Sequence, residues 1–325
     1  MSIVKKEKKF MRLRVCFVVA ILANAVSLYP ESAVTYLMSD GRFGDQLLAY
    51  CHAKWISYRY ALPLLYQPFK YSDQLVMHYV EKRYSAKDFN FSDRVLFNEP
   101  SSIDSKSDIL YLIPFFPESP LEICLEPFDR YYFAVDWKDP VFKAKLRKLI
   151  YPVDGEIPRI KLSSAYVNVA MHIRKGTNFD IILGTDVKDL SDRNKGPLLF
   201  KIPPDSFYID QLKRIADIYS PKPLYVYIFT DHDNPAEIAE RYQSCLSEYR
   251  ITFDYRKEGN SHDANVLEDF FCMAFSPFDC LIRPESHYSF VASKLGDYTM
   301  VFSPKNYFFE GDRAIIDEVT IEMNA

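Results

Sequence analysis

A regular alternation of strand and helix patterns in the second half of the chain constrains the fold most strongly. Short runs rich in β-branched and aromatic residues predict strands at 166–173, 224–230, 251–255, 280–282 and 298–302. Helical patterns between them predict helices at 206–219, 236–249, 265–275 and 287–295. Strands separated by helices of this length form a parallel sheet with helices on its faces. We therefore expect a Rossmann-like α/β domain, which binds its ligands at the carboxyl ends of strands.

The first half of the chain opens with a similar strand, turn and helix. Residues 33–38 predict a strand, and a turn at 39–44 contains two glycines. Asp45 is expected to cap the helix that follows. Further strands are predicted at 64–66, 95–97 and 109–115, and a basic helix at 142–150. The proline-containing segment 152–158 is the expected linker. The sequence thus predicts one Rossmann-like domain at 33–151 and a second at 159–310.

Residues 1–32 differ in composition from the rest of the chain. Six basic residues precede an apolar run at 15–28, and Ala23-Asn-Ala25 has the small-x-small form of a cleavage site. This pattern is typical of a secretory signal peptide. The apolar run is short for a membrane-spanning helix, although an uncleaved membrane anchor remains an alternative. We expect a secretory or membrane-anchored protein, and a cytoplasmic one if the leader does not function.

Charge and cysteine content exclude several classes of protein. The 325 residues carry a formal net charge of -4 with a pI near 5.9, which gives no overall attraction to nucleic acid. Six cysteines are scattered without a CxxC pair, so a disulfide scaffold or a zinc site is not expected. The chain holds only 6 histidines, which further limits metal sites.

A cationic cluster follows the first strand of the second domain. His172 and Arg174 alternate along the strand end, so their side chains share one face. A guanidinium matches phosphate oxygens two at a time, and Gly176 allows the backbone to approach a ligand closely. The sequence predicts an anion site here. The alternative is a solvated strand end with ordinary charges.

Polar residues at other strand ends are expected to complete this site. Asp231 follows the second strand and can accept a hydrogen bond from a nucleoside. Ser286 and Ser289 stand at a helix start, where free N–H groups favour anions, although a serine cap is the simpler interpretation. Glu268 and Asp269 on the preceding helix are either surface charges or partners for a ligand amine.

Taken in order, these segments resemble the α-1,2-fucosyltransferase family. "DGRFGDQLLAYCHAKWIS" is similar to its glycine-turn motif, "HIRKG" to its His-x-Arg-Arg-Gly-Asp motif, and "FTDH" to its strand-plus-acid motif. "LEDFFCMAFSPFDCLIRPESHYSFVASKLG" resembles its last conserved region. Related α-1,6- and protein O-fucosyltransferases share the His-x-Arg pattern. The likeness covers most of residues 33–305.

The resemblance implies a GT-B-like fold, with two Rossmann-like domains facing a cleft. It also implies inverting transfer of fucose from GDP-fucose to a glycan hydroxyl, without an essential metal or other cofactor. Arg174 and His172 would act on the donor pyrophosphate, and Asp231 would contact the nucleoside. By the same resemblance, Gly41, Gly44 and Gln46 would line the cleft from the first domain, and Ser289 and Phe290 would flank the phosphates and base. The expected site also includes Arg42, Gly176, Glu268, Asp269 and Ser286. The general base is expected to be Asp45 or Asp180, with a weak or absent base as the alternative.

This sequence departs from the family pattern at several positions. Asp45 stands where the family has asparagine, and Thr177 stands where an acid is common. Val291 and Ala292 replace a tryptophan pair. The alternatives are therefore a glycosyltransferase with another nucleotide sugar, an inactive relative, and a non-catalytic two-lobed protein that binds a sugar or nucleotide. The expected partners are a nucleotide sugar and a glycan or glycoconjugate acceptor, with no nucleic acid.

Overall fold

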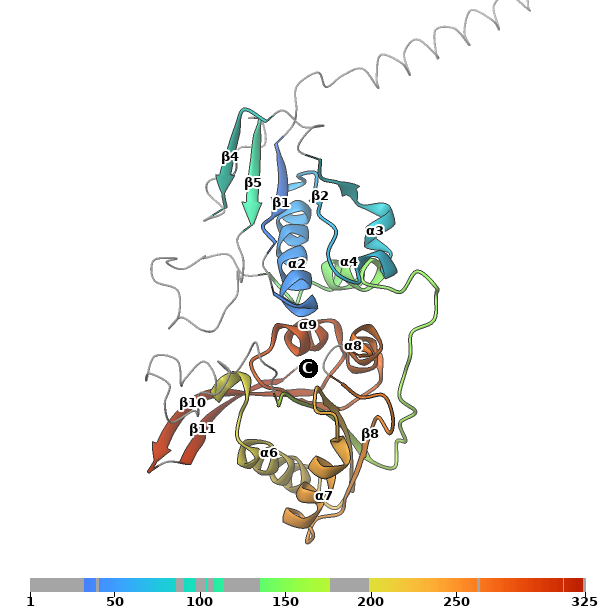
Figure 1. Ribbon diagram of the computed structural model, residues 1–325, viewed down its shortest axis with the longest axis vertical. Helices are drawn as coiled ribbons and strands as arrows, with labels where there is room; N and C mark the ends of the chain where they lie inside the picture. Colours follow the sequence, from blue (N-terminus) through green and yellow to red (C-terminus); the bar gives the residue numbers. More distant parts are fainter. Residues whose placement is uncertain are drawn as a thin grey trace, which may run out of the picture.

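The computed structural model places one main sheet in each half of the chain, and parallel pairing dominates in both. It describes residues 32–38, 41–85, 91–97, 103, 108–113, 135–175, 199–261, 264–311 and 313–323. Within these ranges a three-stranded sheet, a six-stranded sheet and a two-stranded sheet are present. In Figure 1 the elements before residue 150 form a first lobe, which lies above a second lobe formed by the later elements. The segment after residue 150 connects the two lobes. The predicted α/β fold with two parallel sheets is confirmed.

The six-stranded sheet forms the centre of the second lobe. Its order is β11-β10-β9-β6-β7-β8, with all neighbours parallel except the antiparallel β10–β11 pair. The strands are β6 (Val167–Ile173), β7 (Leu224–Thr230), β8 (Ile251–Tyr255), β9 (Cys280–Ile282), β10 (Met300–Glu310) and β11 (Arg313–Met323). The first strand, β6, is central, and the chain adds β7 and β8 on one side before β9 and β10 on the other. Such a reversal is a topological switch point, where α/β sheets bind ligands.

Helices cover both faces of this sheet. They are α6 (Asp205–Ile218), α7 (Pro235–Cys245), α8 (Val266–Phe275) and α9 (His287–Leu295). Figure 1 shows α6 and α7 below the sheet, with α8 and α9 above it, toward the first lobe. All seven residues of β6 are buried because the strand is covered on both faces. His172, near the carboxyl end of β6, is therefore an ionisable side chain in a core strand.

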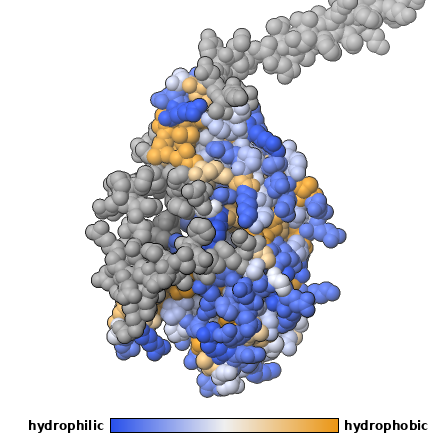
Figure 2. All heavy atoms as spheres, in the orientation of Figure 1, coloured by the Kyte–Doolittle hydropathy of each residue, from blue (hydrophilic) through white to orange (hydrophobic). Residues whose placement is uncertain are grey.

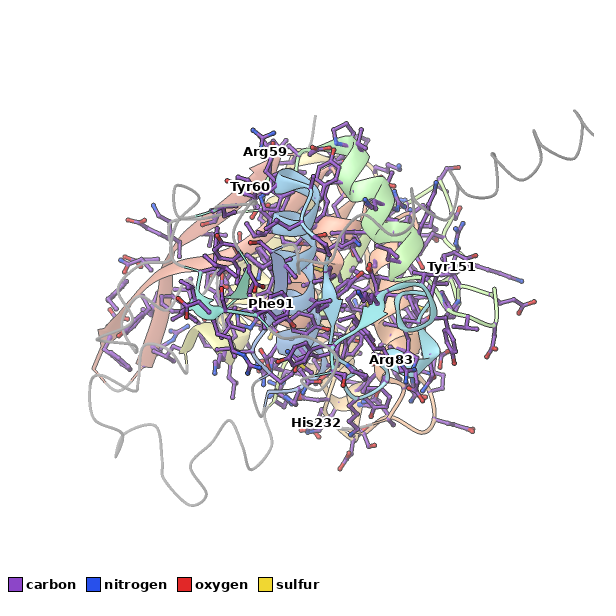
Figure 3. All side chains as sticks on the ribbon, turned by 90° about the horizontal axis from the view of Figure 1, so that it is seen from above. Arg59, Tyr60, Arg83, Phe91, Tyr151 and His232 are labelled. Atoms are coloured by element: carbon purple, nitrogen blue, oxygen red, sulfur yellow. The ribbon has the colours of Figure 1, made fainter. Side chains whose placement is uncertain are left out.

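The first lobe is built around a smaller parallel sheet in the order β1-β5-β4. Its elements are β1 (Ala33–Tyr36), α2 (Phe43–Tyr60), β2 (Leu65–Tyr66), η1 (Ser72–Gln74), α3 (Met77–Val80), β3 (Lys82–Arg83), β4 (Asp93–Leu96), β5 (Ile109–Ile113) and α4 (Pro140–Leu149). Helix α2 ends at Tyr60, and the C-cap residue Ala61 adopts a left-handed conformation. Figure 3 labels Arg59 and Tyr60 at this end of α2.

The two lobes share one hydrophobic core. Phe43 at the start of α2 packs edge-on against Phe270 of α8, with ring centroids 5.4 Å apart. Residues of α2, α4, α8 and α9 belong to the same buried cluster. On the face in Figure 2 the second lobe is mainly hydrophilic, whereas hydrophobic atoms gather over β4 and β5 of the first lobe. Because α2 shares this buried cluster with α8 and α9, burial of apolar area holds the two lobes together.

Most predicted elements of the second half are confirmed. Strands β7, β8 and β9 and helix α9 have the predicted bounds. The structure adds β11, which was not predicted, and extends β10 to Glu310 because the two strands pair as a hairpin. The domain bounds and the linker role of 152–158 stay predictions. Residues 1–31 lie outside the described residues, so the leader also stays a prediction.

Candidate functional site

The carboxyl end of β6 meets the ends of both neighbouring strands at the switch point. Ile173 pairs with Thr230 of β7, and Met171 pairs with Ile282 of β9. Continuing this register places Arg174 beside Asp231, and His172 beside Arg283. The predicted residues Arg174, His172 and Asp231 are thus brought to one edge of the sheet.

His172 is buried and kept neutral. Its side chain faces α9, where its ring lies 5.7 Å from that of Tyr288. Burial lowers the pKa of His172 to about 4, and the charges of Arg42 and Arg283 act in the same direction against that of Asp231. Its Nδ1 has no hydrogen-bond partner in the structure. Native proteins rarely leave a buried polar atom of this kind unpaired, so Nδ1 of His172 is a candidate hydrogen-bonding atom at this edge.

Arg174 and Lys175 follow β6, and Lys175 links the end of that strand to Asp231 after β7. Arg174 is only 7% exposed although it follows the last residue of the strand. The Asp231 carboxylate accepts a hydrogen bond of 2.7 Å from the backbone N–H of Lys175. The Lys175 ammonium in turn binds Asp205 at 2.9 Å. Arg174 is thus a buried strand-end cation and not a solvated one, which favours the anion site over the alternative.

Arg283 is a third buried group at this edge, and the sequence analysis missed it. It directly follows β9 and is 3% exposed. Its Nη1 donates to the Pro284 carbonyl at 3.1 Å and lies 3.6 Å from the Glu285 carboxylate. Its guanidinium carbon lies 5.3 Å from the centroid of the Phe290 ring. The sequence feature that could have identified Arg283 is its position directly after a predicted strand, β9, which pairs with β6.

The first turns of α2 and α9 meet beside this edge. A Cβ atom on Gly44 would come within 2.4 Å of the Tyr288 backbone nitrogen, so only glycine fits there. Gly44 therefore serves the contact between the lobes. Both helices present their amino-terminal ends here, and such ends carry partial positive charge. The prediction that Asp45 is the N-cap of α2 is wrong, because Arg42 holds that position and Asp45 lies three residues later.

Asp45 instead joins the two lobes. One of its oxygens accepts from the Arg42 backbone N–H at 2.9 Å, and the other lies 2.7 Å from Nδ1 of His287 in α9. Burial would raise the pKa of Asp45, but the hydrogen bond and charge of His287, together with Arg42, hold it below its ordinary value. Asp45 is therefore an ionised carboxylate with both oxygens engaged.

The serines at the start of α9 do not act as simple caps. Ser286 holds the N-cap position, but its side chain makes no capping hydrogen bond. Ser289 is fully buried and donates to the Ser286 carbonyl at 3.3 Å. The Phe290 ring contacts both the Arg283 guanidinium and the Lys294 ammonium, and the ammonium is 5.0 Å from the ring centroid. The N–H groups of this turn are thus not bound by the cap side chain.

Glu268 and Asp269 are held by an internal cation. Arg256, which follows β8, lies 3.2 Å from the Glu268 carboxylate and also binds Asp269. Burial raises the pKa of Asp269, and the charge of Arg256 opposes this. The surface-charge interpretation does not fit Asp269, whose side chain is 17% exposed. Their predicted contact with a ligand stays a prediction.

The remaining predicted residues fall on the turn before α2 or outside the described residues. Arg42 is exposed, and Gly41 and Gln46 are partly buried on either side of the α2 start. Gly176 and Asp180 lie outside the described residues. Among the residues that are described, no group of three or more His, Cys, Asp and Glu side chains could hold a metal ion. In the same ranges, no helix combines the length and the hydrophobicity that a membrane crossing requires.

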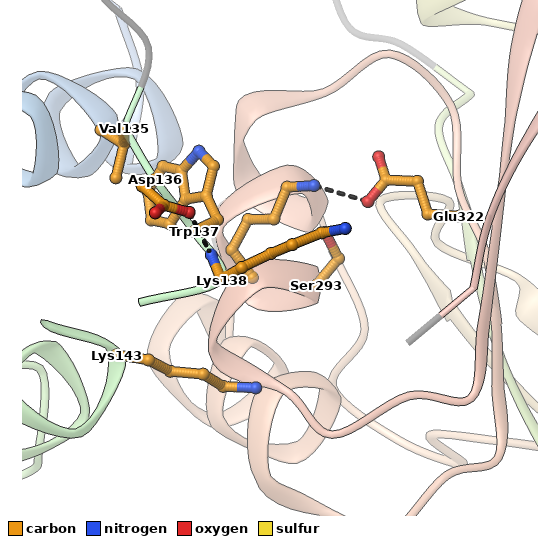
Figure 4. Close-up of a pocket in the computed structure, with 8 residues that line it drawn as sticks. Val135, Asp136, Trp137, Lys138, Lys143, Ser293 and Glu322 are labelled. Atoms are coloured by element: carbon orange, nitrogen blue, oxygen red, sulfur yellow. Dashed lines mark hydrogen bonds and ion pairs between the residues drawn. The ribbon is translucent and has the colours of Figure 1, made fainter. Parts of the chain in front are cut away.

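A hollow lies at the other end of α9, away from these residues. Its volume is about 280 Å³, and it is lined by Val135, Asp136, Trp137, Lys138, Lys143, Ser293, Lys294 and Glu322. Figure 4 labels Glu322 on one side of it, and this carboxylate accepts a hydrogen bond from Lys294. None of the predicted site residues lines this hollow.

Comparisons with known proteins found similar solved structures only. No protein-family model and no curated protein matches the chain. A point mutant of Arabidopsis thaliana FUT1 in complex with GDP has 14% identity and a TM-score of 0.47, covering 85% of this chain and 71% of that one. POFUT1 in complex with GDP has 11% identity and a TM-score of 0.42, covering 84% and 96%. POFUT1 in complex with GDP-fucose has 11% identity and a TM-score of 0.42, covering 82% and 95%.

Proposed function

We propose that this chain is a glycosyltransferase of GT-B-like organisation that transfers fucose from GDP-fucose to a glycan hydroxyl with inversion. The observation that carries the proposal is the convergence at the switch point. Buried Arg174 and Arg283 lie there with neutral His172, beside the amino-terminal ends of two helices. A diphosphate is the ligand that such a group of donors fits.

The leaving diphosphate would be stabilised by donors that are already in place. As the bond between the sugar and the β-phosphate breaks, negative charge grows on the phosphate oxygens. Arg174 and the N–H groups of the first turn of α9 would stabilise this charge. Loss of one preorganised donor of this kind costs roughly 3–4 kcal/mol of barrier. Asp231 would contact the nucleoside, as Glu268 and Asp269 would from α8.

His172 would contribute as a neutral hydrogen-bonding group. Because its pKa is lowered to about 4 by burial, it carries no charge at neutral pH. Its unpaired Nδ1 would bind a polar atom of the donor. Gly41, Arg42 and Gln46 would line the same side from the first lobe. The proposal needs no metal ion or other cofactor, since the arginines and helix ends supply the positive charge.

A non-catalytic nucleotide-binding protein is the second candidate, and one observation favours it. Both oxygens of Asp45, one of the two predicted bases, are already engaged, by Arg42 and by His287. The acceptor glycan, export through the leader and membrane association are further proposals that rest on the sequence pattern.

A panel of nucleotide sugars separates these candidates. The purified protein is incubated with GDP-fucose, GDP-mannose, UDP-glucose or UDP-galactose, and release of the nucleoside diphosphate is measured. We expect GDP release from GDP-fucose above that from the other donors. Release from a UDP sugar alone would point to a different glycosyltransferase. Thermal stabilisation by GDP without any release would support the binding protein.

A further inference from the structure

The hollow at the carboxyl-terminal end of α9 is formed by both lobes. The loop before α4, together with α4 itself, lines it from the first lobe, and α9 and β11 line it from the second. Its volume of about 280 Å³ is close to the lower limit of the range of about 300–1,000 Å³ that is usual for small-molecule sites. The space therefore suits a ligand with a single ring.

Hydrogen bonds fix the loop that lines the hollow from the first lobe. The Asp136 carboxylate accepts from the backbone N–H of Lys138 at 3.0 Å, and the Trp137 N–H donates to the Val135 carbonyl at 2.9 Å. The Trp137 ring packs edge-on against Phe290 of α9, with centroids 5.8 Å apart. Figure 4 shows Lys138 extending from this loop toward α9. The loop thus brings an aromatic ring, a carboxylate and an ammonium to the hollow in a fixed arrangement.

Two of the lysines that line the hollow already have carboxylate partners. The Lys294 ammonium binds Glu322 at 2.5 Å, and the Lys143 ammonium binds Asp297 at 2.9 Å. The Lys294 side chain is 15% exposed, so this pair is a fixed part of the wall. A ligand in the hollow would therefore meet no excess of either charge from these four residues.

Asp136 and Lys138 keep hydrogen-bonding groups that the protein does not use. One oxygen of Asp136 accepts from the loop backbone, whereas its other oxygen and the Lys138 ammonium have no hydrogen bond or ion pair among the described residues. A carboxylate can only accept hydrogen bonds, and an ammonium can only donate them. A ligand that satisfies both must donate and accept, as hydroxyl groups do. An anion would gain Lys138 but would meet the carboxylates of Asp136 and Glu322.

We propose that this hollow binds one neutral sugar unit, with its hydroxyl groups on Asp136 and Lys138 and its apolar face against Trp137. A pyranose ring has hydroxyl groups around its edge and C–H groups on its faces, which match a few polar groups beside an aromatic wall. The unit would belong to the acceptor glycan, a role that rests on the proposed function. Phe290 contacts both Trp137 and the Arg283 guanidinium, so the hollow lies one side chain away from the proposed diphosphate site.

Trp137 itself can report whether the hollow is occupied. The chain has two tryptophans, so a Trp55→Phe variant carries a single reporter, in the wall of the hollow. Its fluorescence is followed during titration with the methyl glycosides of glucose, galactose and N-acetylglucosamine, and with glucuronate and inorganic phosphate as charged probes. We expect a saturable change with at least one neutral glycoside and none with the charged probes. The expected Kd is on the order of 1 mM, because a single sugar offers few atoms for contact. Calorimetric titration of the wild-type protein checks the same binding without the substitution.

Substitutions in the Trp55→Phe background test whether the sugar lies in the hollow. Lys138→Gln and Asp136→Asn each remove a charge but keep a polar side chain of similar size. Each should raise the Kd for the glycoside about 10-fold, because hydrogen bonds to charged groups are stronger than those to neutral ones. Lys148→Gln is the matched control, since Lys148 is exposed on α4 and does not line the hollow. It should bind the glycoside as the Trp55→Phe protein does.

Three outcomes would overturn the sugar site. They are no response to any neutral glycoside by fluorescence or calorimetry, preferred binding of glucuronate or phosphate, and an unchanged Kd in both lining variants. The first would leave the hollow as a gap filled by solvent. Binding and release of GDP test the proposed function separately. If a glycoside binds but GDP neither binds nor is released, the acceptor role fails with the proposed function, and the sugar site stands.

Discussion

The two ends of α9 both join the lobes, but they do so in different ways. At its amino-terminal end, Gly44 meets the Tyr288 backbone, and the Asp45–His287 pair is largely buried. After its carboxyl end, Asp297 binds Lys143 and Arg147, each at 2.9 Å, and its side chain is 67% exposed. The first contact is close and specific, whereas the second is a solvated ion-pair cluster.

The two ends also differ in how completely their polar groups are paired. The exposed cluster satisfies its charges, and solvent weakens what each pair contributes. The buried end leaves Nδ1 of His172 and Nε of Arg283 without hydrogen-bond partners. Unpaired buried groups cost free energy, and these two lie at the edge where the proposed diphosphate would bind. Among the described residues, none that lines the hollow near Trp137 has such an atom.

The largest expected effect is on turnover at the amino-terminal end. Arg174→Ala should lower the rate of GDP release from GDP-fucose by about 100- to 1,000-fold, because the leaving phosphate loses the preorganised guanidinium that stabilises its negative charge. Arg147→Ala, at the other end of α9, is the matched control and should keep the wild-type rate. Steady-state kinetics with circular dichroism of both variants checks this. Normal turnover in Arg174→Ala would contradict the role of that residue.

The next effect is on stability at the same end. Gly44→Ala places a methyl group within 2.4 Å of a backbone nitrogen, and backbone cannot move aside as a side chain can. We expect the free energy of unfolding to fall by about 1–3 kcal/mol, as in overpacked cores. Urea unfolding followed by tryptophan fluorescence measures it. An unchanged midpoint would mean that α2 and α9 do not approach as closely as described.

The smallest effect is expected at the carboxyl-terminal end. Partial burial would raise the pKa of Asp297, but Lys143 and Arg147 bring it below its ordinary value of 3.8. A lowered pKa contributes stability that is present above the ordinary value and is lost as the pH falls through the folded value. Asp297→Asn should therefore cost only about 0.2–1 kcal/mol at pH 7, less in high salt, and nothing well below pH 3.8. A loss that persisted in acid would contradict this account of the pair.

The sequence predicted local elements better than it predicted which of them meet. Periodicity sets the face of a strand or helix, and so it located His172 and Arg174 at the end of β6. It could not show that Asp45 reaches His287, a partner 242 residues away. Asp45 was predicted to be a helix cap for the same reason. An aspartate near a helix start can cap the helix or bind a distant side chain, and the local sequence does not distinguish the two roles. Arg283 was missed because the pairing of β9 with β6 is a property of the sheet order, which local patterns do not determine.

The central claim is that the strand ends of the second lobe bind a diphosphate. Thermal unfolding of the wild-type protein with GDP, and with guanosine at the same concentration, tests it most directly, since the two ligands differ only in their phosphates. The account predicts a rise in Tm with GDP that grows with its concentration, and little or none with guanosine. Equal shifts with both ligands, or none with either, would contradict it.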